Sequence, residues 1–209
     1  TGHIIIGGDI TTSGGTVTSS GAGKAGGAVS IEARNAGTLT ISTGADITTT
    51  GSAAHTSGAG GAGGNVTLNT AATALTLNDT LISTAGAAGA GGGAVGNGGN
   101  IVISDPLSIA TNAVSFNTGT GSTAGDITTS TIDGATAISF TYGGGTLSTG
   151  LIGSNTGLTG VTYSGTSLTL NNNIITDSGA VDITANVNLG ADITINTTNS
   201  GAGAAVTIT

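Results

Sequence analysis

The 209-residue sequence has no cysteine, methionine or tryptophan, one proline, two tyrosines and two phenylalanines. Since leucine, phenylalanine and methionine fill most protein cores, the large side chains of a conventional core are scarce. The apolar residues, 36% of the chain, are mostly alanine, isoleucine, valine and leucine. Any core must therefore be narrow and built from small or β-branched side chains. The absence of cysteine excludes disulfides, and it leaves the redox compartment of the protein open.

Charged residues make up only 6% of the sequence, with ten acidic side chains against Lys24 and Arg34 and a net charge of −8. Two cations cannot form the basic patch that binds phosphates, which excludes a nucleic-acid-binding protein. The longest aliphatic run, Ile4–Ile6, is too short for a membrane span, so no membrane insertion is expected. No signal-peptide pattern opens the chain, and we interpret it as a mature protein or a segment of one.

Glycine is abundant, with 41 residues, and threonine is about as frequent. Such a composition is often disordered because it buries little apolar surface. Here, however, isoleucine, valine and leucine recur periodically and the charge is low. These two features favour an ordered repeat protein over a disordered chain.

Three consecutive units repeat one order of segments. Equivalent residues are 37 positions apart between the first two units, as for Val29 and Val66, and 34 or 35 apart between the second and third, as for Val66 and Ile101, so the period is about 36 residues. Each unit contains a glycine-rich stretch and three short segments in which apolar and polar residues alternate. This alternation, clearest in Val66-Thr67-Leu68 and Leu75-Thr76-Leu77, has the two-residue period of a half-buried strand. No apolar stripe of helical spacing competes with it.

The pattern predicts an all-β fold, a parallel β-helix or β-solenoid, in which each turn stacks its strands about 4.8 Å above those of the turn before. Inward aliphatic side chains form columns, outward Thr and Asn form ladders, and Gly and Asn occupy the corners. We expect residues 1–104 to form turns with long Gly-rich loops that emerge from one edge. Residues 105–209 are expected to continue the same solenoid with shorter corners.

Apolar and polar residues alternate in four segments, Ala45–Thr49, Gly63–Leu68, Leu168–Thr176 and Val187–Ile195. In this texture the sequence resembles the repeat regions of filamentous-haemagglutinin-like adhesins and other giant bacterial surface proteins. The resemblance covers most of the chain and implies a right-handed parallel β-helix. It also implies an extracellular or cell-surface location and a role in adhesion, biofilm or surface-fibre formation.

Residues suited to catalysis are too few to support an enzyme. Glu32 lacks the second carboxylate or the nucleophile–base pair that hydrolysis requires, so no catalytic residue is assigned. His3 and His55 are the only histidines, and His55 lies in a Gly-rich stretch without a second metal-ligating residue nearby. No organic cofactor site is expected.

Calcium is the one metal for which the sequence offers weak candidates, namely Asp9, Asp46, Asp126 and Asp192. Asp9 and Asp46 occupy equivalent positions, and a bound Ca²⁺ could offset their repulsion. The alternative is that these residues lie at corners and accept hydrogen bonds from backbone N–H groups.

Two sets of residues are candidates for contacts with other molecules. The glycine-rich stretches at 13–28, 51–64 and 85–99 are either flexible decoration or stacked segments whose backbone groups pair with each other or with a neighbouring molecule. The solenoid ends are the second set, because neither end shows a cap and the sequence stops within a strand-like segment. The candidates are Gly58, Gly60, Gly61, Gly91, Gly92 and Gly93 in the loops and Ile4, Ile5, Ile6, Val206 and Ile208 at the ends.

The sequence thus predicts a structural segment of a bacterial extracellular fibre or cell-surface adhesin, without catalysis. The alternatives are a filament subunit that stacks head to tail through uncapped ends, and an ice- or carbohydrate-binding module that uses a Thr/Asn face. The expected partners are other copies of the chain, end to end or lateral, and host or environmental glycans or surfaces.

Overall fold

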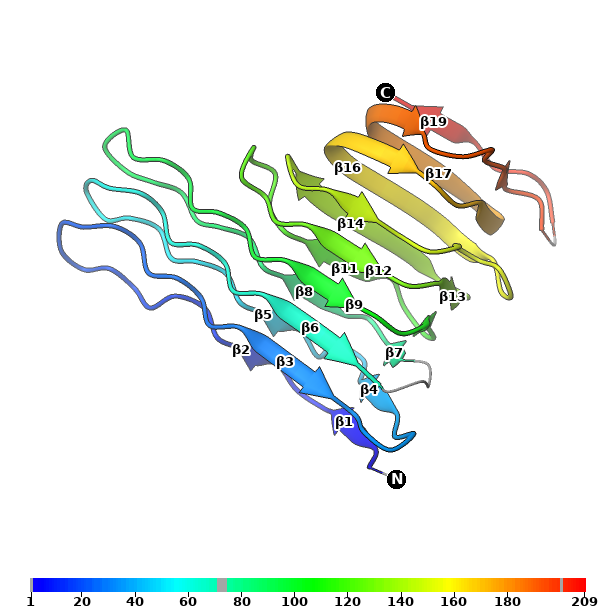
Figure 1. Cartoon of the computed structure of the whole chain (residues 1–209), viewed down its shortest axis with the longest axis horizontal. Helices are drawn as coiled ribbons and strands as arrows, with labels where there is room; N and C mark the ends of the chain where they lie inside the picture. The colour runs from blue at the N-terminus through cyan, green and yellow to red at the C-terminus, as the bar shows by residue number, and fades with distance from the viewer. Residues whose placement is uncertain (1, 71–74, 200) are drawn as a thin grey trace.

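The computed structural model describes residues 2–70, 75–199 and 201–209, and within these residues the regular structure is entirely β-strand. The chain winds repeatedly around one axis, and each of the first five turns contributes one strand to each of three sheets (Figure 1). All strand pairs are parallel. The fold is a parallel β-solenoid, as predicted.

The first five turns build three sheets, here called A, B and C, and of these only sheet B continues into the later turns. Sheet A contains β1 (Ile4–Ile6), β4 (Leu39–Ile41), β7 (Leu75–Leu77), β10 (Leu107–Ile109) and β13 (Ile132–Gly134). Sheet B contains β2 (Ile10–Thr11), β5 (Ile47–Thr48), β8 (Leu81–Ser83), β11 (Val114–Asn117), β14 (Ala137–Gly143), β16 (Leu158–Leu170) and β17 (Ile174–Leu189). Sheet C contains β3 (Val29–Glu32), β6 (Val66–Asn69), β9 (Ile101–Ile103), β12 (Ile127–Thr129) and β15 (Leu147–Ser148).

The last strands follow the same winding. β17 pairs near its beginning with β18 (Ile195–Asn196) and near its middle with β19 (Val206–Ile208). β16 and β17 are 13 and 16 residues long, whereas the strands of the first three turns have two to four residues. No helix of the described residues is long and apolar enough to cross a membrane.

The register places equivalent residues of successive units directly over one another. Val29 pairs with Val66, and Val66 pairs with Ile101, which confirms the alignment of the first three units. Because the register is kept and the side-chain period is two, every second residue of each strand enters a common interior column.

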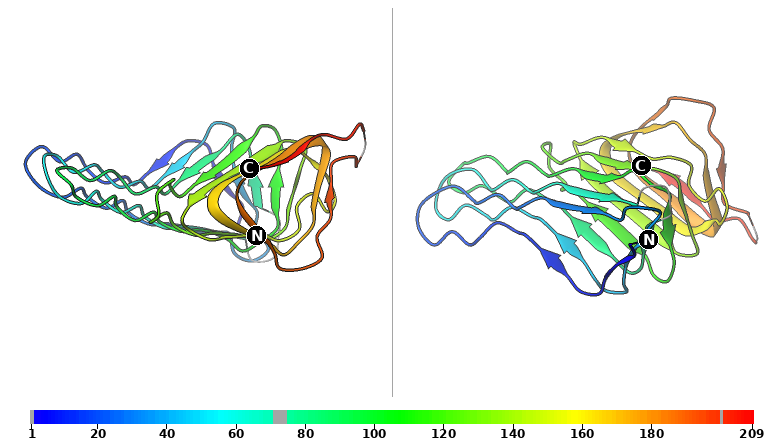
Figure 2. Two further views of the ribbon diagram at one scale, coloured as in Figure 1. Left: turned by 90° about the horizontal axis from the view of Figure 1, so that it is seen from above. Right: turned by 60° about the horizontal axis from the view of Figure 1, so that its bottom comes forward.

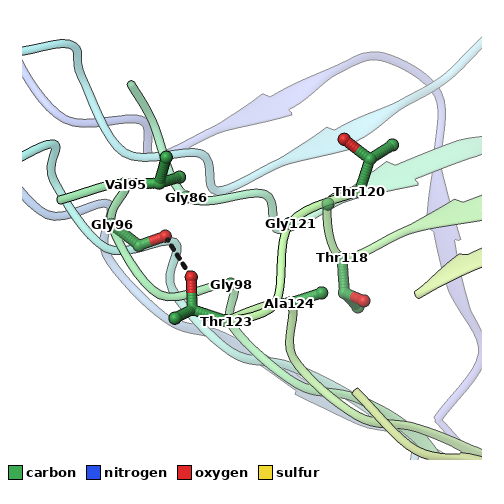
Figure 3. Close-up of a pocket in the computed structure, with 10 residues that line it drawn as sticks. Gly86, Val95, Gly96, Gly98, Thr118, Thr120, Gly121, Thr123 and Ala124 are labelled. Carbon is green, nitrogen blue, oxygen red and sulfur yellow. Dashed lines mark hydrogen bonds between the residues drawn. The ribbon is translucent and has the colours of Figure 1, made fainter. Parts of the chain in front are cut away.

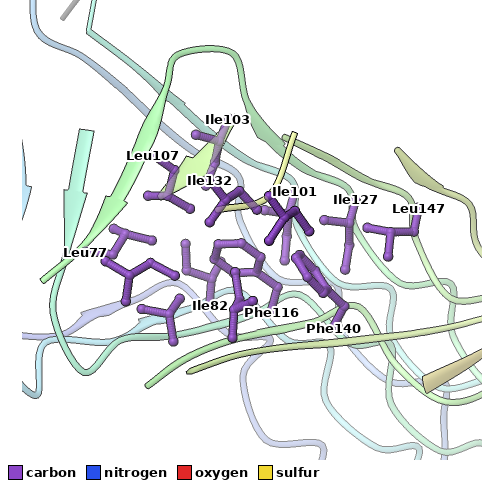
Figure 4. Packing of buried hydrophobic residues seen from close by; sticks show 14 of the residues in the cluster. Leu77, Ile82, Ile101, Ile103, Leu107, Phe116, Ile127, Ile132, Phe140 and Leu147 are labelled. Carbon is purple, nitrogen blue, oxygen red and sulfur yellow. The ribbon is translucent and has the colours of Figure 1, made fainter. Parts of the chain in front are cut away.

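The core contains larger side chains than the composition suggests (Figure 4). In sheet B the column of Ile47 and Ile82 continues as Phe116, Phe140 and Tyr163, all buried. The Phe116 and Phe140 ring centroids are 5.7 Å apart, and Tyr163 stacks on Phe140 at 5.4 Å. The expectation of small or β-branched side chains alone is wrong for this region, since all four aromatic residues of the chain are buried there.

Three long loops leave the body on one side and lie over one another (Figures 1 and 2). Each connects sheet B with sheet C in one of the first three turns: residues 12–28 form the first loop, 49–65 the second and 84–100 the third. We call this stack of three loops the glycine wedge. Its position confirms that the Gly-rich loops protrude from one edge in the N-terminal half.

Candidate functional site

The glycine wedge begins at a neck that a threonine closes in each turn. The Thr hydroxyl donates to the carbonyl of a glycine 15 residues later, and in return that glycine's N–H donates to the Thr carbonyl. The hydroxyl bonds join Thr12 to Gly27 at 2.6 Å, Thr49 to Gly64 at 2.6 Å and Thr84 to Gly99 at 2.5 Å. The return bonds are 2.6, 2.7 and 2.7 Å long. Since Thr49 and Thr84 are fully buried, these threonines lie inside the fold, and the prediction that Thr faces outward is wrong at this column.

The loops of the wedge are held to each other by backbone hydrogen bonds. On the outgoing legs, Gly51 N–H donates to the Ala85 carbonyl at 3.1 Å; on the return legs, Gly60 N–H donates to the Ala94 carbonyl at 2.9 Å. Within the second loop, Gly61 N–H donates across to the Ser52 carbonyl at 2.9 Å. The wedge is therefore an ordered stack, which confirms that its backbone groups pair with each other and contradicts the interpretation as flexible decoration.

Glycine is required inside the wedge because the chains approach without room for a side chain. A Cβ atom at Gly61 would collide with the carbonyl of Lys24 in the loop below, and one at Gly63 with the carbonyl of Thr84 in the loop above. Gly58, Gly61 and Gly64 follow a three-residue spacing. All three face the backbone of the first loop, which leaves no room for a side chain at these positions.

The wedge ends at the fourth turn, where the connection between β11 and β12 is short. There Thr118 closes the neck onto the carbonyl of Gly125, seven residues later, at 2.7 Å. Gly98 N–H donates to the Thr123 carbonyl at 2.7 Å, so the stack continues only at its base. A shallow pocket lies between the third loop and this short connection, and Val95 is one of the residues that line it (Figure 3).

The candidate loop residues divide between the interior and the tips of the wedge. Gly60 and Gly61 lie inside it, against backbone of neighbouring layers. Gly58 and Ala90 exchange hydrogen bonds between the second and third loops. The remaining candidates are Gly91 and Gly92, at the tip with φ angles of 60° and 84°, and Gly93, whose Cβ would meet the Gly58 carbonyl.

The candidate calcium residues do not form one site. Asp9 Oδ1 accepts the Asp46 N–H at 3.1 Å, and Asp46 Oδ1 accepts the Leu81 N–H at 2.8 Å, so these two share a corner column. Asp126 lies at a different corner, where its Oδ1 accepts the Thr146 N–H at 2.7 Å. Asp192 lies between β17 and β18, away from both columns. Across the described ranges, no three His, Cys, Asp or Glu side chains gather where a metal could bind.

Corner residues with a side-chain oxygen tie each turn to the next. Besides the aspartates, Asn65 Oδ1 accepts the Asn100 N–H and Asn100 Oδ1 accepts the Asp126 N–H, at 2.8 and 2.9 Å. The structure thus shows the hydrogen-bonded corner role that the sequence offered as the alternative to calcium.

The other titratable candidates, Glu32, His3 and His55, each make separate hydrogen bonds and share no partner. Glu32 accepts two hydrogen bonds from Arg34 at the exposed end of β3. His3 Nδ1 lies 2.9 Å from the Thr38 hydroxyl. His55 lies in the second loop, where its backbone N–H donates to the Gly21 carbonyl.

The outer face of sheet B is neutral and polar. One outward column runs through seven turns as Thr11, Thr48, Ser83, Asn117, Thr141, Ser164 and Thr184. Hydroxyl and amide groups on a rigid spacing can donate and accept hydrogen bonds to a surface or a glycan, but Ser83 is buried and only four of the seven residues are threonine.

Apolar side chains are exposed at both ends of the solenoid. Ile5 of β1 is 71% exposed, and Val206 and Ile208 of β19 are 43% and 58% exposed. Ile4 and Ile6 are partly buried and pack against the core.

Two buried tyrosines stand out in the turns without long loops. The hydroxyls of Tyr142 and Tyr163, like that of Thr129, have no hydrogen-bond partner in the part of the chain that the structure describes. Burial raises the pKa of Tyr142 to about 12, and raises that of Tyr163 further still, because the ionised phenolate would be desolvated. Tyr142 follows Thr118 in the neck column, and Gly165 leaves space for its ring.

The neck threonines are the residues that sequence reasoning missed. A signal for them was present, since Thr12, Thr49 and Thr84 each precede a glycine by 15 residues although the unit length varies. No family model, curated protein or solved structure matches this chain.

Proposed function

We propose that the chain is a structural segment of a bacterial extracellular fibre or cell-surface adhesin, of the kind that filamentous-haemagglutinin-like proteins form. The observation that carries this proposal is the unbroken parallel pairing from β1 to β19. In such a solenoid each turn contacts only its neighbours, so the molecule is a stiff rod whose length scales with the number of turns. This is the mechanical property that a surface fibre requires.

The outer surface supports the same role. The sheet B column offers hydroxyl and amide groups, and the chain carries few charges, so contacts with surfaces or glycans depend little on ionic strength. Adhesion through many weak, regularly spaced groups would gain avidity from their number.

Antibodies against the purified chain test the location and the role together. They should label intact source cells without permeabilisation, and antigen-binding fragments should lower attachment of those cells to a glycan-coated surface. Labelling that appears only after permeabilisation would contradict the proposal. Fragments against an unrelated surface protein serve as the control.

A second candidate is a filament subunit that stacks head to tail, which the exposure of Val206 and Ile208 favours, since these residues end the buried columns of Val181 and Ile183. Exposed strand edges and aliphatic columns are templates for further pairing. Electron microscopy should then show uniform fibres with an axial repeat of one chain. Val206→Thr and Ile208→Thr should abolish them, whereas Val95→Thr, an exposed aliphatic residue away from the ends, should not.

The third candidate is an ice- or carbohydrate-binding module that uses the sheet B face. Its support is the rigid column of Thr, Ser and Asn side chains. Thermal hysteresis that Thr48→Ala and Thr141→Ala reduce would favour ice binding, and glycan-array binding with the same sensitivity would favour the carbohydrate version.

A further inference from the structure

Two residues break the glycine pattern of the wedge, one on each outer layer. Lys24 in the first loop occupies the position of Gly61 in the second, by the same 37-residue offset that pairs Val29 with Val66. Val95 in the third loop occupies the position of Gly60 in the second, by the 35-residue offset that pairs Val66 with Ile101.

The packing explains why side chains are allowed at these two positions only on the outside. Glycine is needed at 61 because a Cβ there would meet the Lys24 carbonyl of the loop below, and at 60 because it would meet the Ala87 carbonyl of the loop above. Within the described residues, no loop lies below Lys24 or above Val95. Both residues are exposed, Val95 by 52%.

The two outer layers also carry unpaired backbone groups of opposite kind. In the second loop, the N–H groups of Gly51 and Gly60 donate to carbonyls of the third loop. Their counterparts in the third loop are the N–H groups of Gly86 and Val95, together with that of Gly89; these have no partner among the described residues. On the opposite face, the first loop has three carbonyls likewise unpaired in the described chain, those of Ser13, Ala22 and Ala25.

The two faces are therefore complementary in kind, because the third loop offers backbone N–H groups and the first loop offers backbone carbonyls. We propose that Lys24 and Val95 act as blocking residues, which keep the wedge of a second copy of this chain from stacking on these faces. A side chain at either position holds an incoming backbone away from these groups, just as a Cβ atom at Gly60 or Gly61 would hold neighbouring loops apart. Exposed edges with unpaired groups are commonly protected by such residues, lysine above all.

The body of the molecule restricts how a second copy approaches. The turns from β14 onward rise beside the third loop (Figure 1). A second wedge therefore has to come from the side of the loop tips, with its own body beyond them. The contact joins the N–H face of one copy to the carbonyl face of another and leaves one face of each kind free, so a dimer formed in this way can add further copies. Such oligomers are joined through the wedges, whereas the fibre considered above is joined through the solenoid ends.

The test replaces both blocking residues with glycine and compares Lys24→Gly/Val95→Gly with Lys24→Ala/Val95→Ala. Both double variants lose the charge and the exposed aliphatic group, but only the alanine variant keeps the Cβ atoms. Sedimentation velocity over a concentration series should show dimers or larger oligomers for the glycine variant, with a dissociation constant at least about tenfold below that of the wild type. The alanine variant should sediment as the wild type does.

Two outcomes would overturn the proposal. One is equal self-association of the glycine variant and the wild type; the other is equal association of the alanine and glycine variants, which would assign the effect to solubility. Val206→Thr and Ile208→Thr are introduced into every protein compared, so that association through the solenoid ends does not contribute to the result.

Amide hydrogen exchange on the wild-type protein tests the premise without a substitution. The N–H groups of Gly60 and Gly63 should be protected, whereas those of Gly86 and Val95 should exchange at nearly the rate of an unstructured peptide. In the dimer of the glycine variant, Gly86 should become protected. Strong protection of Val95 N–H in the wild type would show that this face is already covered and would refute the inference.

Discussion

The turns with long loops and the turns without them share one solenoid but are stabilised in different ways. In the first three turns the core is aliphatic, and the loops are held outside it by backbone hydrogen bonds between glycine-rich chains. From the fourth turn the loops shorten, and Phe116, Phe140 and Tyr163 enlarge the core. Backbone stacking requires the absence of side chains, whereas core packing requires large ones.

The neck column shows where one solution replaces the other. Four successive positions are Thr12, Thr49, Thr84 and Thr118, each of which donates its hydroxyl to a carbonyl across the neck. The next position is Tyr142, whose hydroxyl has no partner among the described residues. Where no loop has to be closed, a side chain that fills volume takes the place of one that makes a hydrogen bond.

The largest expected effect lies in the aromatic core. Phe140→Ala should lower the free energy of unfolding by about 3–5 kcal/mol, because it leaves a cavity between the rings of Phe116 and Tyr163. The outward Thr162→Ala in the next turn should change it by no more than about 0.5 kcal/mol. Urea denaturation measures both. If Phe140→Ala also lowers amide protection in the wedge, the two regions unfold as one unit. They would then differ in how they are packed but not in their stability.

Alkaline pH should destabilise the turns that contain Tyr142 and Tyr163. The folded-state pKa of Tyr142, about 12, lies above the unfolded value of 10.0. Between these values the folded state binds more protons, so its stability is constant below pH 10 and falls as the pH rises. Tyr142 alone should cost about 2 kcal/mol by pH 12. Urea titrations at several pH values should show this slope for the wild type and a smaller one for Tyr142→Phe; a flat wild-type profile up to pH 12 would contradict the burial argument.

Alanine substitutions in the wedge should depend strongly on position. Gly63→Ala forces a Cβ onto the Thr84 carbonyl and should cost about 1–3 kcal/mol of local stability. Gly15→Ala, which meets nothing within 4 Å, should be neutral. Amide exchange in the three loops is the measurement, since the wedge can open without the core. Equal effects of the two substitutions would mean that the layers are not in close contact.

The smallest effect is expected at the neck. Thr84→Val keeps the shape of the side chain but leaves the Gly99 carbonyl without its hydroxyl donor, for a loss of about 1–2 kcal/mol. Thr67→Val, which changes an outward residue of β6, is the matched control. The difference should appear first as faster amide exchange in the third loop, and its absence would show that the return bond from Gly99 N–H closes the neck by itself.

Much of the fold could be predicted because the period-two alternation and the repeat of about 36 residues can both be read from the linear sequence. The predicted stacking of Val29 on Val66, the emergence of the loops from one edge and the pairing of the Gly-rich stretches are all confirmed. The candidate site could be predicted only as a region. The four aspartates were grouped by sequence context, yet they lie at three different corners.

The sequence by itself determined the winding, the register and the side from which the loops emerge, because alternating side chains and a fixed repeat leave one way to bury the aliphatic columns. Only the tertiary structure decided which threonines turn inward, since that depends on a carbonyl 15 residues away. It also decided which glycines are indispensable, because their collisions are with chains from other turns. A local pattern specifies which face a residue takes, whereas the space available at that face depends on what the neighbouring turn places there.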